Sequence, residues 1–331
     1  MIITREKLIR LAKDHVEQLA RQEPSILSGY LIGTVTKGEP LLGGTADVDL
    51  VVIHTIQPTQ PREVRPLSSD IHLDIYHHAS SFYDQPTLLR VDPWWGPALS
   101  EPVFLHDPDH FFERVQAGVR GQFHRPDHAL ARAQASLNQA RSAHQSLAHN
   151  GAWPSALLEA ALLGANAVAG LTGFPAAGRR LSLLLEAKSA ELGQSRVYRA
   201  FLRLLGAEAM GAWQTPELLT AWGQAFDAAG EASGALEFSA ARRAYLLSGF
   251  QALAEADHPE AVLWPLLASW DQAVRILSNH GLPASQRSVW DDLLARLGLE
   301  PTRAGVRVDE LESFLDHVES ALDEWAQATG A

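Results

Sequence analysis

Residues 46–53 read Ala-Asp-Val-Asp-Leu-Val-Val-Ile, an apolar run with two carboxylates at its start. Short runs rich in Val and Ile are typical of strands buried in a sheet. Because strand side chains alternate, Asp47 and Asp49 share one face, while Val48 and Leu50 share the other. The pattern predicts a strand over 48–55 that packs one face on a core and carries an acidic pair at its beginning.

A third carboxylate lies in the middle of a second apolar run, Ile-His-Leu-Asp-Ile-Tyr at residues 71–76. If the two strands are neighbours, Asp74 faces the same way as Asp47 and Asp49. Three carboxylates this close raise each other's pKa unless a cation neutralises them. Oxygen ligands in a chain without cysteine favour Mg²⁺ or Mn²⁺ over zinc. The sequence therefore predicts a divalent metal site formed by these three aspartates.

Upstream, residues 30–38 read Tyr-Leu-Ile-Gly-Thr-Val-Thr-Lys-Gly, a strand that runs into a glycine and a hydroxyl residue. Gly33 permits close approach of the backbone, and the Thr34 hydroxyl and the amides of the turn can donate to phosphate oxygens. Lys37 adds a cation. We expect these three residues to bind a triphosphate, and the glycines that follow to let the loop return to the acidic strand (Gly38, Gly43 and Gly44).

Gly33-Thr34, Asp47-x-Asp49 and the later strand residue Asp74 together resemble the motifs of the nucleotidyltransferase superfamily related to DNA polymerase beta, in particular its small-molecule and minimal branches. The resemblance covers roughly residues 26–108. Thr34 stands where the family commonly has Ser, which keeps the hydroxyl, and the spacer 39–44 contains Pro40 and two adjacent glycines.

The resemblance implies a magnesium-dependent enzyme that moves a nucleoside monophosphate from a nucleoside triphosphate, with ATP expected, to a hydroxyl of a small molecule. The acceptor would be aminoglycoside-like or another polyol, and pyrophosphate would leave. Asp47, Asp49 and Asp74 would hold the metal, and Asp74 would also assist deprotonation of the acceptor. In several small-molecule members a carboxylate from the helical domain completes the cleft, and Glu159 is the candidate here.

Other interpretations of the same residues remain open at this point. Asp47 could be a turn residue after Gly43-Gly44-Thr45, and Asp74 an exposed strand acid. The chain could also keep the fold without catalysis, as a regulatory or antitoxin-like protein that binds a partner protein, or it could modify a protein side-chain hydroxyl.

Composition narrows the function classes. The chain has 331 residues, 27 Lys and Arg against 39 Asp and Glu, a formal net charge of −12 and no cysteine. This excess of acid argues against general nucleic-acid binding, and the lack of cysteine fits the cytoplasm. The charged N-terminal residues leave no room for a signal-peptide core, and the apolar stretch 157–171 is too short to cross a bilayer. We expect a soluble cytoplasmic protein.

The hydrophobic pattern predicts an α+β fold. A nucleotidyltransferase domain with a small mixed sheet would span residues 1–120, and an all-helical substrate-binding domain would span residues 121–331, with the junction in 119–127. In the first domain we expect a helix over 4–21, strands over 26–32, 48–55 and 71–77, irregular chain over 91–109 with a short strand at 103–105, and a helix from His110. The helices expected in the second domain are 127–149, 154–171, 178–192, 195–205, 215–229, 233–255, 259–279, 285–297 and 307–327.

Several further residues have both a functional and a plain interpretation. His72, Tyr76, His77 and His78 could bind metal or transfer protons near Asp74, or could be partly exposed histidines of a strand and loop. Trp94 and Trp95 could stack on a base or fill a domain interface. Glu159 and Asn166 share one helix face. Glu159 could complete the acceptor cleft, or it could simply face solvent.

Arg179 and Arg180 could reach a phosphate, although solvation at a helix end is the simpler interpretation. Arg275 and His280 have the Arg-x4-His spacing of a helical RNase superfamily, but a helix end before Asn-His-Gly-Leu-Pro explains them better.

Overall fold

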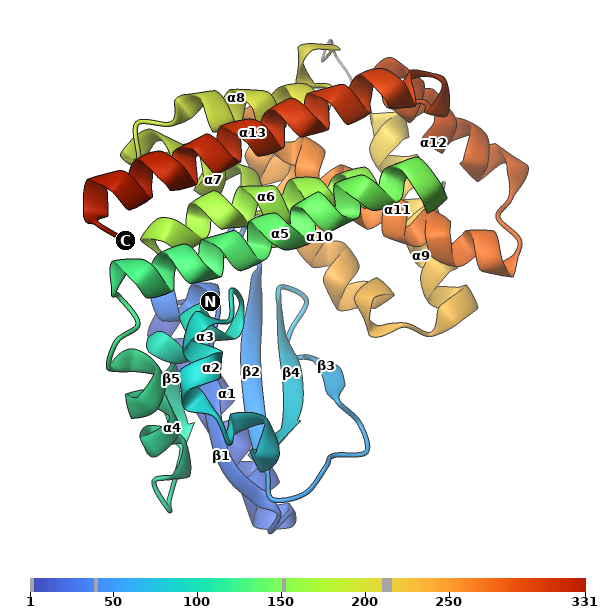
Figure 1. Ribbon diagram of the computed structural model, residues 1–331. Coiled ribbons are helices and arrows are strands. Elements are labelled where there is room, and N and C mark those ends of the chain that lie inside the picture. The colour runs from blue at the N-terminus through green and yellow to red at the C-terminus, as the bar shows by residue number, and fades with distance from the viewer. Residues whose placement is uncertain (1–2, 39–40, 151–152, 210–215, 257) are drawn as a thin grey trace. The chain divides into compact units, whose positions relative to one another are not determined.

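The computed structural model describes residues 3–38, 41–150, 153–209, 216–256 and 258–331. The chain forms two compact units, residues 1–128 and 129–331. The first contains a five-stranded mixed sheet and the second is mostly helical (Figure 1), which confirms the predicted α+β class. The sequence had suggested a domain boundary between residues 120 and 121. The spacer residues 39 and 40 and the predicted helix start at residue 215 lie outside the described residues.

The sheet has the strand order β3-β4-β2-β1-β5. The central strands β2 and β4 run parallel, and the other neighbouring pairs are antiparallel. The strands predicted around residues 26–32, 48–55, 71–77 and 103–105 are confirmed. The strand bounds are Ile26–Leu31 for β1, Ala46–His54 for β2, Arg62–Pro66 for β3, Ile71–Ala79 for β4 and Val103–His106 for β5.

Strand β3 was not predicted from the sequence. Its five residues contain two arginines and a glutamate and are preceded and closed by prolines, so the run lacks the Val and Ile pattern of a buried strand. It forms because its backbone pairs antiparallel with β4, with Arg62 opposite Tyr76 and Val64 opposite Asp74. As the edge of the sheet, β3 can contain Pro and charge without breaking a ladder on its outer side.

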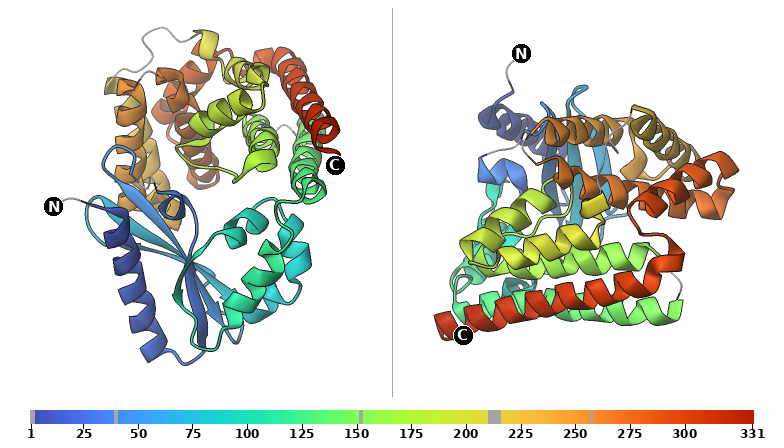
Figure 2. Two further views of the ribbon diagram at one scale, coloured as in Figure 1. Left: turned by 90° about the vertical axis from the view of Figure 1, so that its left-hand side faces the viewer. Right: turned by 90° about the horizontal axis from the view of Figure 1, so that it is seen from above.

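Helices cover both faces of the sheet (Figure 2, left), as follows from the alternation of its strands. One face packs on α1, Arg5–Gln22, which begins after Thr4 as predicted, with the Thr4 hydroxyl accepting from the Lys7 amide at 3.3 Å. This core includes Val48, Leu50 and Leu73. The other face packs Tyr30, Val51 and Ile53 on residues that include Tyr83, Leu99 and Phe112.

The second face is covered by short helices. Residues 91–109, where irregular chain was expected, include α3, Trp95–Ser100, so that prediction was only partly right. Asp92 holds the start of this helix, because its Oδ1 accepts from the amides of Trp94 and Trp95 at 2.8 and 2.6 Å. The helix expected from His110 is confirmed as α4 at Phe111–Arg120, and the other short elements are η2 at Ser80–Tyr83 and α2 at Pro86–Val91.

An aromatic cluster lies between the sheet and these helices. Tyr30 Oη and Tyr83 Oη lie 2.7 Å apart, and His78 Nδ1 lies 2.8 Å from Tyr83 Oη. Trp95 packs edge-on against His78, with ring centroids 4.6 Å apart. Trp95 is therefore held inside the first unit, and burial lowers the pKa of His78 to about 4.

The low pKa of His78 predicts a fold that loses stability in mild acid. The unfolded chain binds a proton at the ordinary histidine pKa near 6.5, while the folded chain binds it only near pH 4, so stability falls as pH drops between these values. At pH 5 the loss from this one group should be about 2 kcal/mol. Urea unfolding at pH 7.5 and pH 5 measures it. The variant His78→Gln keeps an acceptor for Tyr83 but does not titrate, and its pH-dependent loss should be smaller by about that amount; an equal loss would contradict this assignment.

The second unit confirms the predicted helices with small shifts of their ends. The largest shift is at α10, Ala240–Glu255, which begins later than expected because Ser239 caps it by accepting from the Arg242 amide at 3.4 Å. The other helices are α5 at Pro126–Asn150, α6 at Ser155–Thr172, α7 at Leu181–Glu191, α8 at Ser195–Leu204, α9 at Pro216–Ser233, α11 at Leu263–His280, α12 at Ala284–Arg296 and α13 at Ala304–Thr329.

Helix α6 is the centre of the helical unit. It packs beside α13 (Figure 2, right), and an added Cβ on Gly164 would clash with the Phe314 ring, so the glycine permits this close approach. α6 is long and apolar enough to cross a membrane, so the expectation that this stretch is too short was wrong, but 78% of that span is buried inside the protein. Such burial is typical of a core helix in a soluble protein.

Candidate metal centre

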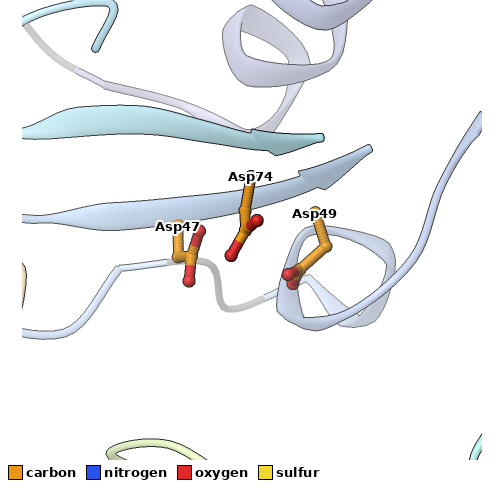
Figure 3. A group of neighbouring side chains, drawn as sticks. All are labelled: Asp47, Asp49 and Asp74. Carbon is orange, nitrogen blue, oxygen red and sulfur yellow. The ribbon is translucent and has the colours of Figure 1, made fainter. Parts of the chain in front are cut away.

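Asp47, Asp49 and Asp74 come together on one face of the sheet, as the sequence predicted. The parallel pairing of β2 and β4 sets Asp49 directly beside Asp74, and Asp47 lies one pleat earlier on the same face. One carboxylate oxygen from each residue lies within 4.8 Å of the other two, and the three side chains gather on one side of the strands (Figure 3). Asp74 is only 1% exposed and Asp47 lies inside β2, so neither an exposed strand acid nor a turn residue describes them.

The register that forms this cluster is fixed by the opposite face. Val48 and Leu50 on β2 and Ile75 on β4 are fully buried in the core against α1. A shift of one residue would send these side chains to the polar face and the aspartates into the core. Burial of the apolar residues therefore sets the acids side by side despite their mutual repulsion.

Gly33 touches the cluster directly. Its φ of 73° and ψ of −155° belong to a region that residues with a Cβ rarely adopt, and a Cβ added there would overlap Oδ2 of Asp49. The neighbouring Ile32 amide donates to the Asp49 carbonyl at 3.0 Å. Gly33 thus lets the turn after β1 lie against the Asp49 carboxylate.

The turn after Gly33 is a short 3-10 helix, η1, at Thr34–Lys37. The Thr36 hydroxyl donates to the Gly33 carbonyl at 2.9 Å, and Arg5 donates from α1 to the Val35 carbonyl at 2.7 Å. Thr34, the predicted phosphate ligand, follows Gly33 at the start of this turn. Positive φ values of 96°, 61° and 73° at Gly38, Gly43 and Gly44 turn the chain back toward β2, as expected.

Lys37 is held by a partner in the first unit. Its Nζ donates to Glu101 Oε2 at 2.9 Å. Burial lowers the pKa of Lys37, while the hydrogen bond from Lys37 lowers the pKa of Glu101. The ammonium is thus fixed near the start of the chain's return to β2, and its contact with a triphosphate stays a prediction.

The cation that contacts the cluster was not predicted from the sequence. Arg62, on β3, forks onto Asp74, with Nε 2.7 Å from Oδ1 and Nη2 2.5 Å from Oδ2. Its guanidinium carbon also lies 5.2 Å from the centre of the Tyr76 ring. Burial, with the nearby Asp49 and Asp74 charges, raises the pKa of Tyr76 well above its ordinary range. Only the pairing of β3 with β4 reveals this arginine, and the one hint in the sequence is a basic residue near an isolated strand acid.

The four residues predicted around Asp74 separate into three environments. His72 and Tyr76 share the face of the aspartates, and His72 Nε2 lies 3.1 Å from Asp47 Oδ1 with its side chain 2% exposed. His77 faces the opposite side, where its Nδ1 lies 2.9 Å from Nε2 of His54. His78 belongs to the aromatic cluster. Of these histidines, His72 is the one that lies against an aspartate of the cluster, among the contacts described for this unit.

In the helical unit, Glu159 and Asn166 have different surroundings. Glu159 is exposed and lines a groove of about 560 Å³ between α5 and α6, together with Ser142, Ser146 and Leu162. Asn166 is 3% exposed and holds the following loop, since its Oδ1 accepts from the Ala176 amide and its Nδ2 donates to the Ala176 carbonyl, both at 2.8 Å. Asn166 is therefore structural, and the role of Glu159 stays a prediction.

Arg179 has a structural role in the helical unit. Arg179 is 3% exposed, donates to the Tyr245 carbonyl at 2.5 Å and stacks on the Tyr245 ring, so its expected solvation at a helix end is wrong. His280 Nδ1 lies 2.9 Å from the Ile276 carbonyl at the end of α11, where Gly281 has a φ of 93°. The helix-end interpretation of the Arg-x4-His spacing is confirmed.

The arrangement combines an oxygen-only ligand set with a glycine turn in contact with it. Carboxylates suit hard divalent cations, and Mg²⁺ bound in this way keeps positions for water and phosphate oxygens. Comparison with known proteins adds no relative: the chain matches no protein-family model and no curated protein.

Proposed function

We propose that this chain is a metal-dependent nucleotidyltransferase with the DNA polymerase beta-like fold in its first unit. The observation that carries the proposal is the trio Asp47, Asp49 and Asp74, with ligand oxygens within 4.8 Å of one another. Gly33, which touches Asp49, supports it as the glycine of the triphosphate turn. The order of Gly33-Thr34, the acidic pair and the later strand acid is that of the superfamily.

The residues fit a divalent cation. Three carboxylates converge on one face, and their opposite face is anchored in the core, so the acids cannot separate without disturbing the sheet. The ion, Mg²⁺ or Mn²⁺, would act as a Lewis acid on the α-phosphate and would neutralise charge on the triphosphate. Asp47, Asp49 and Asp74 would hold it, and Gly33 and Thr34 would bind phosphate oxygens.

In the proposed reaction, an acceptor hydroxyl oxygen attacks the α-phosphorus of ATP or another nucleoside triphosphate. The new bond joins that oxygen to phosphorus, the bond between the α-phosphorus and the bridging oxygen breaks, and pyrophosphate leaves. A base takes the hydroxyl proton. Asp74 is expected to assist; both its oxygens accept from Arg62, and its part in deprotonation stays a prediction. The resemblance suggests Glu159 as the carboxylate of the helical unit that completes the cleft, and this role stays a prediction.

The acceptor is proposed to be a small polyol, aminoglycoside-like or otherwise. The groove beside Glu159 offers hydroxyl and carboxylate groups with an apolar side, which suits a molecule with several hydroxyl or ammonium groups. The cytoplasmic location proposed from the composition would give access to nucleoside triphosphates. No role at a membrane or in general nucleic-acid binding is proposed.

The test is pyrophosphate release by the purified protein. ATP, GTP, CTP and UTP are supplied singly with Mg²⁺ and with pools of aminoglycosides, other polyols or cell lysate. We expect release with ATP that requires both Mg²⁺ and one acceptor pool, and labelled protein in the lysate arm would show a protein acceptor instead. Calorimetry that finds no binding of any of the four nucleotides, with or without Mg²⁺, would contradict the proposal and favour a noncatalytic partner-binding protein.

A further inference from the structure

Arg62 forms an ion pair with Asp74, the buried aspartate of the proposed metal site. Asp74 is 1% exposed, and both its oxygens accept from the same guanidinium, at 2.7 and 2.5 Å. A two-point contact of this kind is the strongest arrangement between Arg and a carboxylate. Arg62 therefore supplies positive charge to the cluster.

A divalent cation held by all three aspartates needs an oxygen of Asp74. That oxygen would have to be shared with, or released by, Arg62, because a guanidinium and a metal ion repel each other at such short range. The two cations thus compete for one carboxylate. A ligand that binds the same group as a resident side chain is linked to it, so each weakens the other.

The position of Arg62 allows its side chain to move away from Asp74. It is the first residue of β3, the edge strand of the sheet, and its side chain is 25% exposed, compared with 1% for Asp74. The Tyr76 ring lies beside it, with the guanidinium carbon 5.2 Å from the ring centre. An aromatic face attracts a guanidinium, so Arg62 has a second partner within reach when Asp74 turns to a metal ion.

We propose that Arg62 is a resident counter-cation that holds Asp74 in the ion-free state and must release at least one Asp74 oxygen when a divalent cation binds. The inference rests on the proposed function, since it concerns the same ion site. It adds a control on that site: the affinity for the cation is set partly by Arg62.

Binding of Mn²⁺ to the full chain at pH 8, followed by electron paramagnetic resonance, tests the inference. Arg62→Met should bind Mn²⁺ about tenfold or more tightly than the unchanged protein, the order expected when a competing ligand is removed. Arg65→Met is the matched control, because Arg65 lies on the same strand but contacts His15 at 3.0 Å on the opposite face. It removes the same charge and should change the affinity less than twofold, as an estimate for a distant charge.

A second measurement needs no substitution at Arg62. The Arg62 Nε–H resonance of the unchanged protein should shift on addition of Mg²⁺, and should not shift in Asp47→Asn/Asp49→Asn. A resonance that stays in place while calorimetry shows Mg²⁺ bound would overturn the inference, as would equal or weaker Mn²⁺ binding by Arg62→Met. In both cases, binding that is lost in the double variant would leave the metal site standing. Failure of both the unchanged protein and Arg62→Met to bind Mn²⁺ would overturn the site and the inference together.

Discussion

Replacing Asp47 and Asp49 together with Asn should abolish nucleotide transfer while leaving the protein folded. Two of the three ligand carboxylates become neutral amides of the same size, so the divalent cation loses most of its charge partners. We expect activity to fall by about 10³-fold or more, equivalent to about 4 kcal/mol of transition-state stabilisation. Pyrophosphate release at saturating Mg²⁺ measures it.

The same variant should be no less stable than the unchanged protein in buffer with a chelator. Removing two negative charges from the cluster relieves repulsion with Asp74, so urea unfolding should begin at the same or a higher concentration. The double variant Asp70→Asn/Asp84→Asn removes two exposed acids, makes the same change in net charge and should keep full activity. Full turnover by Asp47→Asn/Asp49→Asn would contradict the assignment of these residues.

Gly33→Ala is expected to have the second-largest effect. Its φ of 73° with ψ of −155° is strained for alanine, and the added Cβ would overlap Oδ2 of Asp49. The strain should cost about 1–3 kcal/mol of stability. Displacement of the Asp49 carboxylate, or of the turn, should lower activity by about 100-fold, as a shift of an ångström in a reacting group does.

Gly38→Ala separates the effect of backbone strain from the effect of contact with Asp49. Gly38 also has a positive φ, 96°, but a Cβ there would meet nothing within 4 Å. Gly38→Ala should therefore lose stability from strain yet keep activity within about threefold, while Gly33→Ala loses both. Equal activity of the two variants, measured as pyrophosphate release alongside urea unfolding, would show that contact with Asp49 is unimportant.

The part of the site that lies on regular strands could be predicted from the sequence. Alternation in two apolar runs sets Asp47, Asp49 and Asp74 on one face whenever those strands are neighbours. Parallel pairing of β2 and β4 then brings Asp49 beside Asp74. The helices of the second unit were predicted for a similar reason, because a 3.6-residue pattern is local in the chain.

Features that depend on pairing between distant segments could not be predicted in this way. Arg62 reaches Asp74 only because the short edge strand β3 pairs with β4. Asn166 is one of two polar residues on one face of an apolar helix, and its partners are backbone groups of Ala176 in a loop that the helical pattern does not place. The Glu159 groove likewise needs two helices, and no single helix reveals it.

The proposed metal site requires one divalent cation to bind between three carboxylates on β2 and β4. Crystals grown with Mn²⁺ and recorded at the manganese absorption edge test this binding directly, because manganese gives its own anomalous signal. We expect one strong peak in coordination contact with Asp47, Asp49 and Asp74. Crystals that show no peak there, or manganese bound only at other acidic side chains, would contradict it.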